Sequence, residues 1–66
     1  MKQRYAQMST AYDFNTQRAT CIVVSTDGKD QFACQYNPNV DCSIDMMADE
    51  RSRFLTEKNL IITWSD

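Results

Sequence analysis

The stretch TCIVVSTDGKDQFACQY, residues 20–36, decides the fold. β-Branched and aromatic residues, which suit a half-buried sheet surface, lie on both sides of the pair Asp27-Gly28. Asp-Gly between two such runs is a strong signal for a two-residue turn with positive φ angles that joins antiparallel strands. The sequence therefore predicts a β-hairpin in which Thr26 pairs with Lys29.

In this register, alternate residues of the two strands share one face of the hairpin. They are Ala19, Cys21 and Val23 on the first strand, and Tyr36, Cys34 and Phe32 on the second. Cys21 and Cys34 are expected to form a non-hydrogen-bonded pair, whose short Cα separation would permit a disulfide. A three-residue turn with a bulge is the alternative, and it would turn Ile22 toward Phe32 instead.

The Asn-Pro-Asn segment at residues 37–39 ends the second strand, because proline has no backbone donor and disfavours helix in the residue before it. A helix is predicted next, with Asp41 or Ser43 as its cap, Lys58 near its end and Asn59 as its left-handed terminator. Its apolar stripe consists of Ile44, Met47, Ala48, Phe54 and Leu55.

The two ends of the chain complete the fold prediction. Leu60, Ile62 and Trp64 alternate with Ile61, Thr63 and Ser65, which indicates a short closing strand. The first eighteen residues fit either a strand, with alternate side chains from Ala6 to Phe14 on one face, or a helix with a stripe of Tyr5, Met8 and Tyr12. The strand is preferred, because Tyr12 and Phe14 are strand formers. We therefore predict an α+β fold: one domain over residues 1–66, with a small antiparallel sheet in β-β-β-α-β order packed on one amphipathic helix.

Length and composition narrow the class of protein. A chain of 66 residues forms a single core that is too small to enclose a large substrate cavity. The hydrophobic fraction of 42% argues against disorder. No apolar run approaches the roughly 18 to 20 residues that span a bilayer, and the N-terminus lacks the apolar segment of a signal peptide. Three cysteines, an odd number, fit a reducing compartment, so we expect a cytoplasmic protein.

The cysteines are the first candidates for chemistry. There are three cysteines, Cys21, Cys34 and Cys42, and no two of them have the Cys-x-x-Cys spacing. The chain has no histidine, so a zinc site would need an aspartate, or a residue of a second subunit, as its fourth ligand. Free thiols are the favoured interpretation. Without histidine, the serines have no recognisable base, and the helix carboxylates lack the order of a calcium loop. The sequence thus predicts no metal, no cofactor and no enzymatic activity.

Charge is distributed unevenly along the chain. Residues 1–29 carry four basic and two acidic side chains, whereas residues 30–66 carry three basic and seven acidic ones. Four of the acidic side chains, Asp41, Asp45, Asp49 and Glu50, fall at the start of the predicted helix, where a spacing of four stacks the aspartates along one edge. They either cap and solvate the helix or attract a basic surface on a partner.

Three large side chains are candidate anchors for a protein contact. Met46 lies beside the acidic edge rather than on the apolar stripe, and Tyr36 and Trp64 belong to residue types that concentrate in interface centres. Core positions are the alternative for both rings, and for Trp64 the core is the preferred expectation. The predicted partner-binding residues are Asp41, Asp45, Met46, Asp49, Glu50, Tyr36 and Trp64.

The architecture resembles in outline the compact proteins that bacteriophages and mobile elements use to block a host enzyme or defence complex. That resemblance implies a small inhibitor or adaptor in a bacterial cytoplasm, which covers a site on a larger partner with a basic surface. The alternative function is a nucleic-acid-binding regulator that uses Arg4, Arg18 and Lys29 with the sheet aromatics Tyr12 and Tyr36. A third interpretation is an oligomer subunit that pairs through an open sheet edge.

Overall fold

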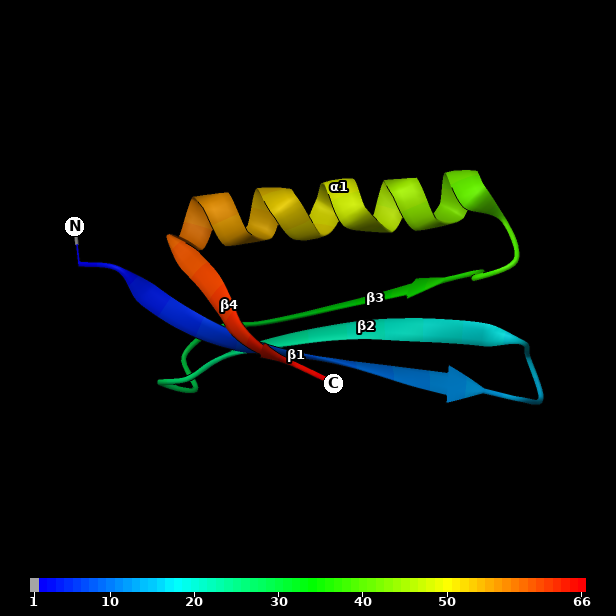
Figure 1. Ribbon diagram of the computed structural model, residues 1–66, viewed down its shortest axis with the longest axis horizontal. Helices are drawn as coiled ribbons and strands as arrows, with labels where there is room; N and C mark the ends of the chain where they lie inside the picture. The colour runs from blue at the N-terminus through cyan, green and yellow to red at the C-terminus, as the bar shows by residue number, and fades with distance from the viewer. Residues whose placement is uncertain (1) are drawn as a thin grey trace.

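The computed structural model describes residues 2–66 and shows one helix packed on a four-stranded sheet. The elements are β1 (Arg4–Asp13), β2 (Arg18–Ser25), β3 (Gln31–Tyr36), α1 (Asp41–Lys58) and β4 (Leu60–Ser65). Figure 1 shows α1 lying along one side of the sheet, whose strand order is β3-β2-β1-β4. The predicted α+β class and the β-β-β-α-β order are confirmed, and the N-terminal segment is a strand.

The sheet is mixed rather than antiparallel throughout. β1 pairs with β2, and β2 with β3, in antiparallel fashion, but β4 runs parallel to β1. The prediction of an antiparallel sheet is therefore wrong at the last strand. The reason is the crossover: α1 carries the chain back along the sheet after β3, so the strand that follows runs in the same direction as β3 and therefore as β1.

The hairpin of β2 and β3 has the predicted register, with Cys21 opposite Cys34. Its turn differs from the prediction, since the Gly28 N–H donates to the Ser25 carbonyl at 3.0 Å. The turn is therefore centred on Thr26 and Asp27, and Gly28 follows it with a φ of 75°. Asp27 has no positive φ, so the expected primed Asp-Gly turn is wrong. This wider loop needs the left-handed conformation only at Gly28, the residue that follows the turn.

The core lies between α1 and the adjoining sheet face. Its buried apolar members are Ala6, Ala19, Cys21, Val23, Met47 and Leu60. Around them pack partly buried side chains, among which the rings of Phe32 and Phe54 stack with centroids 5.3 Å apart. The predicted apolar stripe of α1 is confirmed, because all its members are buried or half-buried.

The two ends of α1 are held differently. Asn59 ends the helix with φ 55° and ψ 49°, as its left-handed propensity predicts. At the other end Val40 is the cap residue and makes no side-chain hydrogen bond, so the assignment of the cap to Asp41 or Ser43 is wrong. The Ser43 hydroxyl accepts the N–H of Asn37 at 2.9 Å instead, which joins the loop before the helix to its first turn.

A bulge in β4 reverses the orientation of its second half. Ala6 pairs with Ile62, but the next residue of β1, Gln7, pairs with Trp64, which leaves Thr63 as the extra residue. Trp64 therefore points away from α1, on the same sheet face as Ile61. It is 54% exposed, so the expectation that it forms the centre of the core is wrong.

Candidate binding surfaces

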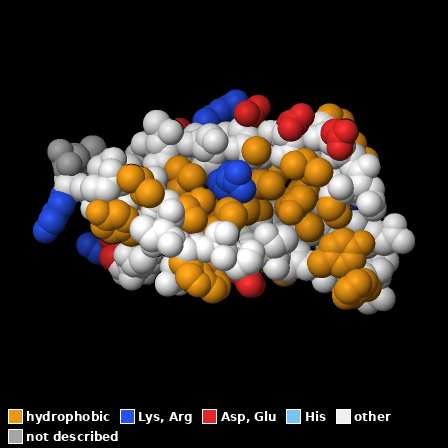
Figure 2. Space-filling model, in the orientation of Figure 1, with side chains coloured by type: hydrophobic (Ala, Val, Ile, Leu, Met, Phe, Trp, Pro, Cys, Tyr) orange, Lys and Arg blue, Asp and Glu red, His pale blue; other side chains and the backbone are white. Residues whose placement is uncertain are grey.

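The predicted partner-binding residues lie on four different parts of the molecule. Asp41, Asp45 and Asp49 form an acidic row, exposed along one flank of α1. In Figure 2 acidic side chains follow one another along the upper edge of the molecule, above a band of hydrophobic side chains. The spacing of four residues produces this row, because successive residues of a helix turn by about 100°.

Met46 and Glu50 belong to the flank of α1 that faces β3. The Glu50 carboxylate accepts a hydrogen bond from the Cys34 thiol at 3.3 Å, which places this flank over the β3 edge. Met46, one turn earlier, is 65% exposed. Tyr36 projects from β3 toward the helix and packs against the core half-buried. The structure thus brings Met46 and Glu50 to one side of the helix, whereas Tyr36 packs in the core region.

Trp64 belongs to the sheet face that α1 leaves uncovered, which we call the open sheet face. Tyr5, Val24, Ile61 and Trp64 are its large exposed apolar residues, with exposures of 48%, 37%, 50% and 54%. Tyr5 pairs with Ile61, and Gln7 of β1 lies between Val24 and Trp64. Among the strand residues that the structure describes, Asp13 and Arg18 are the charged ones on this face, and they are paired at its far end.

Sequence reasoning identified Trp64 but missed its three neighbours. The available signal was the alternation of β1 and β4, where Tyr5 and Ile61 occupy the positions opposite to the buried Ala6 and Leu60. That signal identifies a face only when the pairing of the two strands is known. The parallel pairing of β1 with β4 joins residues far apart in the chain, and no local pattern specifies it.

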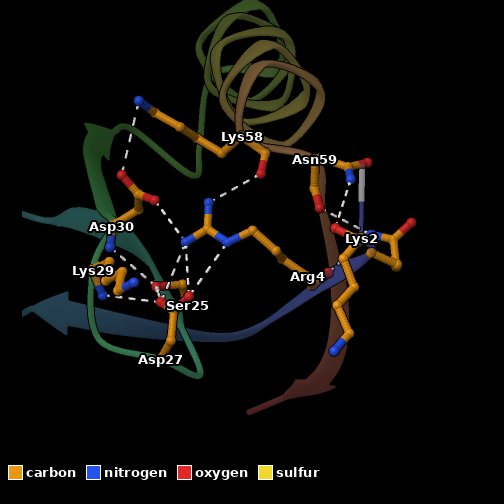
Figure 3. A network of polar contacts seen from close by, with 9 residues as sticks. Lys2, Arg4, Ser25, Asp27, Lys29, Asp30, Lys58 and Asn59 are labelled. Carbon is orange, nitrogen blue, oxygen red and sulfur yellow. Dashed lines mark hydrogen bonds and ion pairs between the residues drawn. The ribbon is translucent and has the colours of Figure 1, made fainter.

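A polar network connects three segments at one end of the molecule (Figure 3). The Arg4 guanidinium donates to Asp27 Oδ2 at 3.1 Å, to Asp30 Oδ2 at 2.7 Å and to the Lys58 carbonyl at 3.1 Å. Lys58 Nζ lies 3.8 Å from Asp30 Oδ1. The network therefore ties the start of β1, the β2–β3 turn and the end of α1 together.

Asp27 accepts more hydrogen bonds than any other residue in this network. The Ser25 hydroxyl donates to Asp27 Oδ1 at 2.6 Å, and the Lys29 N–H donates to the same oxygen at 3.0 Å. These bonds, with the neighbouring Arg4, lower the pKa of Asp27 from 3.8 to about 2. In turn, the pKa of Arg4 is raised, above all by its hydrogen bond to Asp30. A carboxylate held in its charged form by these three groups acts as a structural brace.

The three cations of the nucleic-acid alternative do not converge on one surface. Arg4 is bound by two carboxylates in the polar network. Arg18 begins β2, and Lys29 follows the other end of that strand, so the length of β2 separates them. Of the aromatic platforms proposed for this function, Tyr12 is 43% exposed, whereas Tyr36 packs against the core.

The thiols differ in access. Cys21 is buried, Cys34 is half-buried and Cys42 is exposed, and all three are free. Burial, then the bond to Glu50, raises the pKa of Cys34. The Ser25 N–H donates to the Asp30 carbonyl, so alternation along the hairpin makes Cys21 and Cys34 a hydrogen-bonded pair rather than the expected non-hydrogen-bonded one.

Neither an enclosed pocket nor a cluster of metal-ligating side chains is present among the residues that the structure describes. In the same part of the chain, no helix has the length and apolar character needed to cross a membrane. Comparison with known proteins gives no match, whether with family models, curated proteins or solved structures.

Proposed function

We propose that this chain is a non-enzymatic protein-binding module that covers a site on a larger protein as an inhibitor or an adaptor. The observation that carries the proposal is the open sheet face. In a two-layer fold each strand normally alternates between apolar residues that face the core and polar or charged residues that face water. Here its centre is uncharged and exposes Tyr5, Val24, Ile61 and Trp64. Exposed apolar side chains gathered on one face, here with Gln7 among them, support an interaction site.

The chemistry of the open sheet face defines the partner. Interface centres are depleted of charge and enriched in tryptophan and tyrosine, which supply large contact areas. Trp64 and Tyr5 supply them here, on strands that hold both rings on a rigid surface. The partner therefore offers a flat or grooved apolar surface to this face.

The acidic row has a separate role in the proposal. It lies on the helix layer, so it does not share one flat contact with Trp64. Asp41, Asp45 and Asp49 give this layer a negative field, which would attract a partner with a basic surface and speed the encounter. On the grounds of size, element order and acidity, we extend the proposal to a phage- or mobile-element-type antagonist of a host or defence protein in a bacterial cytoplasm.

Parallel capture with surface variants tests the proposal. Three proteins are immobilised separately: the native chain, the variant Trp64→Thr, and a charge variant with Asp45→Lys and Asp49→Lys. Each is then exposed to bacterial lysate. A protein that the native chain retains is then purified, and its affinity for the native chain and for each variant is measured. For this protein we expect Trp64→Thr to weaken affinity by about 30-fold or more, because a central tryptophan contributes roughly 2 kcal/mol or more.

Thermal melting is the control, since threonine keeps strand propensity at an exposed position and should leave the fold intact. The charge variant should retain affinity at physiological salt but associate more slowly at low salt. A partner that binds Trp64→Thr as tightly as the native chain would contradict the assignment of the open sheet face. Loss of binding only in the charge variant would transfer the site to the acidic row.

A further inference from the structure

β3 forms one edge of the sheet. It has β2 as its neighbour on one side, and no strand among residues 2–66 pairs with its outer side. β3 is an internal strand of the chain, placed at this edge by its hairpin with β2 and by α1, which Figure 1 shows running back along it. The outer side of Gln31–Tyr36 is therefore a strand edge.

The hydrogen-bond pattern identifies the outward backbone groups of β3. The Ser25 N–H donates to the Asp30 carbonyl, so these two residues form a hydrogen-bonded pair at the start of the ladder between β2 and β3. Such pairs recur at every second residue, so alternate residues of β3 bond to β2, and those between them direct N–H and C=O outward. The outward residues are Gln31, Ala33 and Gln35.

The β3 edge lacks the usual protection. Exposed edges are normally blunted by proline, lysine, a bulge or a covering element. β3, with the sequence QFACQY, contains no proline and no charged residue, and its pairing with β2 shows no bulge. α1 packs on the face that carries Phe32 and Cys34, and the three outward residues are exposed. This edge is a template for another strand.

Two side chains of opposite charge border the edge in the helix layer. Glu50 projects toward β3, where its carboxylate accepts the Cys34 thiol at 3.3 Å. Arg53 follows three positions later, so it projects from the same flank of α1, and it is exposed. Neither residue takes part in an ion pair within residues 2–66. Both charges are therefore available to a partner at this edge.

We propose that the outer edge of β3 pairs with the same edge of a second copy, strand against antiparallel strand about a two-fold axis beside Ala33. Ala33 then lies opposite Ala33 of the second copy, and Gln31 of each copy lies opposite Gln35 of the other. Each of these three pairs forms two hydrogen bonds, which gives six in total, because their N–H and C=O groups all point outward. The glutamine side chains meet on the open sheet face, where their amides hydrogen-bond to each other.

The helix layer favours a second copy over an unrelated strand. Phe54 stacks on Phe32, and Glu50 bonds to Cys34, so these helix residues lie level with the strand residues on either side of Ala33. The two-fold axis beside Ala33 exchanges these two levels. Glu50 of one copy therefore comes level with position 54 of the other, next to Arg53, and two Glu50–Arg53 pairs form across the axis. An unrelated strand satisfies the backbone groups but leaves both charges unpaired.

The dimer joins two four-stranded sheets into one sheet of eight strands with β4 at both ends. Trp64 lies on these outer strands, so the surface of the proposed function stays accessible. An edge of six residues is about 20 Å long. The contact is therefore smaller than a standard interface, and we expect a dissociation constant of roughly tens to hundreds of micromolar.

Sedimentation of the native protein from about 10 µM to 1 mM tests the proposal, and a shift from monomer to dimer across this range is expected. Amide exchange by NMR locates the contact. The Phe32 and Cys34 amides, bonded to β2, should be protected at all concentrations. The Ala33 and Gln35 amides should exchange fast in dilute protein and gain protection at the highest concentration. A protein that stays monomeric throughout the range overturns the proposal.

A proline at the axis tests the backbone pairing. Ala33→Pro removes an outward donor without breaking the ladder to β2, and Ala33→Thr, which keeps the N–H and suits a strand, is its control. We expect Ala33→Pro to weaken dimerisation at least tenfold, because both central hydrogen bonds are lost, and Ala33→Thr to leave it unchanged. Circular dichroism checks that each variant is folded.

A charge exchange tests the helix contact without touching the sheet. Glu50→Arg and Arg53→Glu each place like charges across the axis, so each should weaken the dimer about two- to tenfold at low salt. The double variant restores both pairs and should dimerise like the native chain. A dimer that the proline or the single charge variants leave unchanged, or amide protection along β1 in place of β3, refutes the register. Trp64→Thr should dimerise like the native chain, which separates this inference from the proposed function.

Discussion

Gly28→Ala should destabilise the fold through backbone conformation alone. Gly28 has a φ of 75°, in the left-handed region where a Cβ conflicts with the backbone. A Cβ built at this position meets no heavy atom within 4 Å, so no packing term adds to the cost. The expected loss in the free energy of unfolding is about 1 kcal/mol for alanine. It is larger for valine, whose branched Cβ is more restricted.

This loss is measurable because the domain is small. A single core of this size supplies about 3 to 5 kcal/mol, so 1 kcal/mol corresponds to a fall of roughly 4 to 8 °C in the melting temperature. Urea and thermal unfolding, followed by far-UV circular dichroism, measure it. Gln17→Gly is the matched opposite, since Gln17 has a φ of 57° without being glycine. It should gain up to about 1 kcal/mol. Unchanged melting of both Gly28→Ala and Gly28→Val would refute the left-handed turn and with it the reasoning.

Three further predictions concern charge, thiols and the exposed indole. Because the pKa of Asp27 is lowered to about 2, its stabilising contribution is complete above about pH 5 and lost as the pH falls from about 4 to 2; in acid titrations Asp27→Asn should therefore lose less stability than the native chain over that range. A thiol reagent followed by mass spectrometry should label exposed Cys42 first, half-buried Cys34 more slowly and Cys21 only on unfolding; early Cys21 labelling would contradict its burial. Acrylamide should quench Trp64 in the folded protein nearly as well as in urea, whereas strong protection would place the indole in an interface or the core.

The elements that sequence predicts well are those set by neighbours along the chain. The hairpin register follows from strand residues on either side of one turn, and the loop geometry changes without altering which residues pair. Likewise, the stripe of α1 and the terminator Asn59 depend on local spacing and on a single left-handed conformation. The prediction of the helix cap is wrong because the turn from Asn37 to Val40 leads directly into the helix and leaves Val40 at the cap position.

The features that sequence does not predict depend on contacts between distant segments. The position of β4 beside β1, its parallel direction and the bulge at Thr63 appear only when the first and last segments meet. Strict alternation places Trp64 with Leu60 in the core, and one extra residue transfers it to the other face. Similarly, Arg4 is a free cation in the sequence, and only the fold brings it to Asp27 and Asp30.

The open sheet face arises from the geometry of β4. Its first half is fixed, because the backbone of Arg4 bonds to Asn59 and its side chain reaches the carbonyl of Lys58. Its second half contains the bulge that turns Trp64 to the open sheet face. A regular β4 would turn the indole to the face that α1 covers, which would add to the core of a small domain. A strand that is braced at its start and bulged in its middle therefore leaves apolar side chains exposed on one sheet face, and exposed apolar patches mark sites where proteins bind one another.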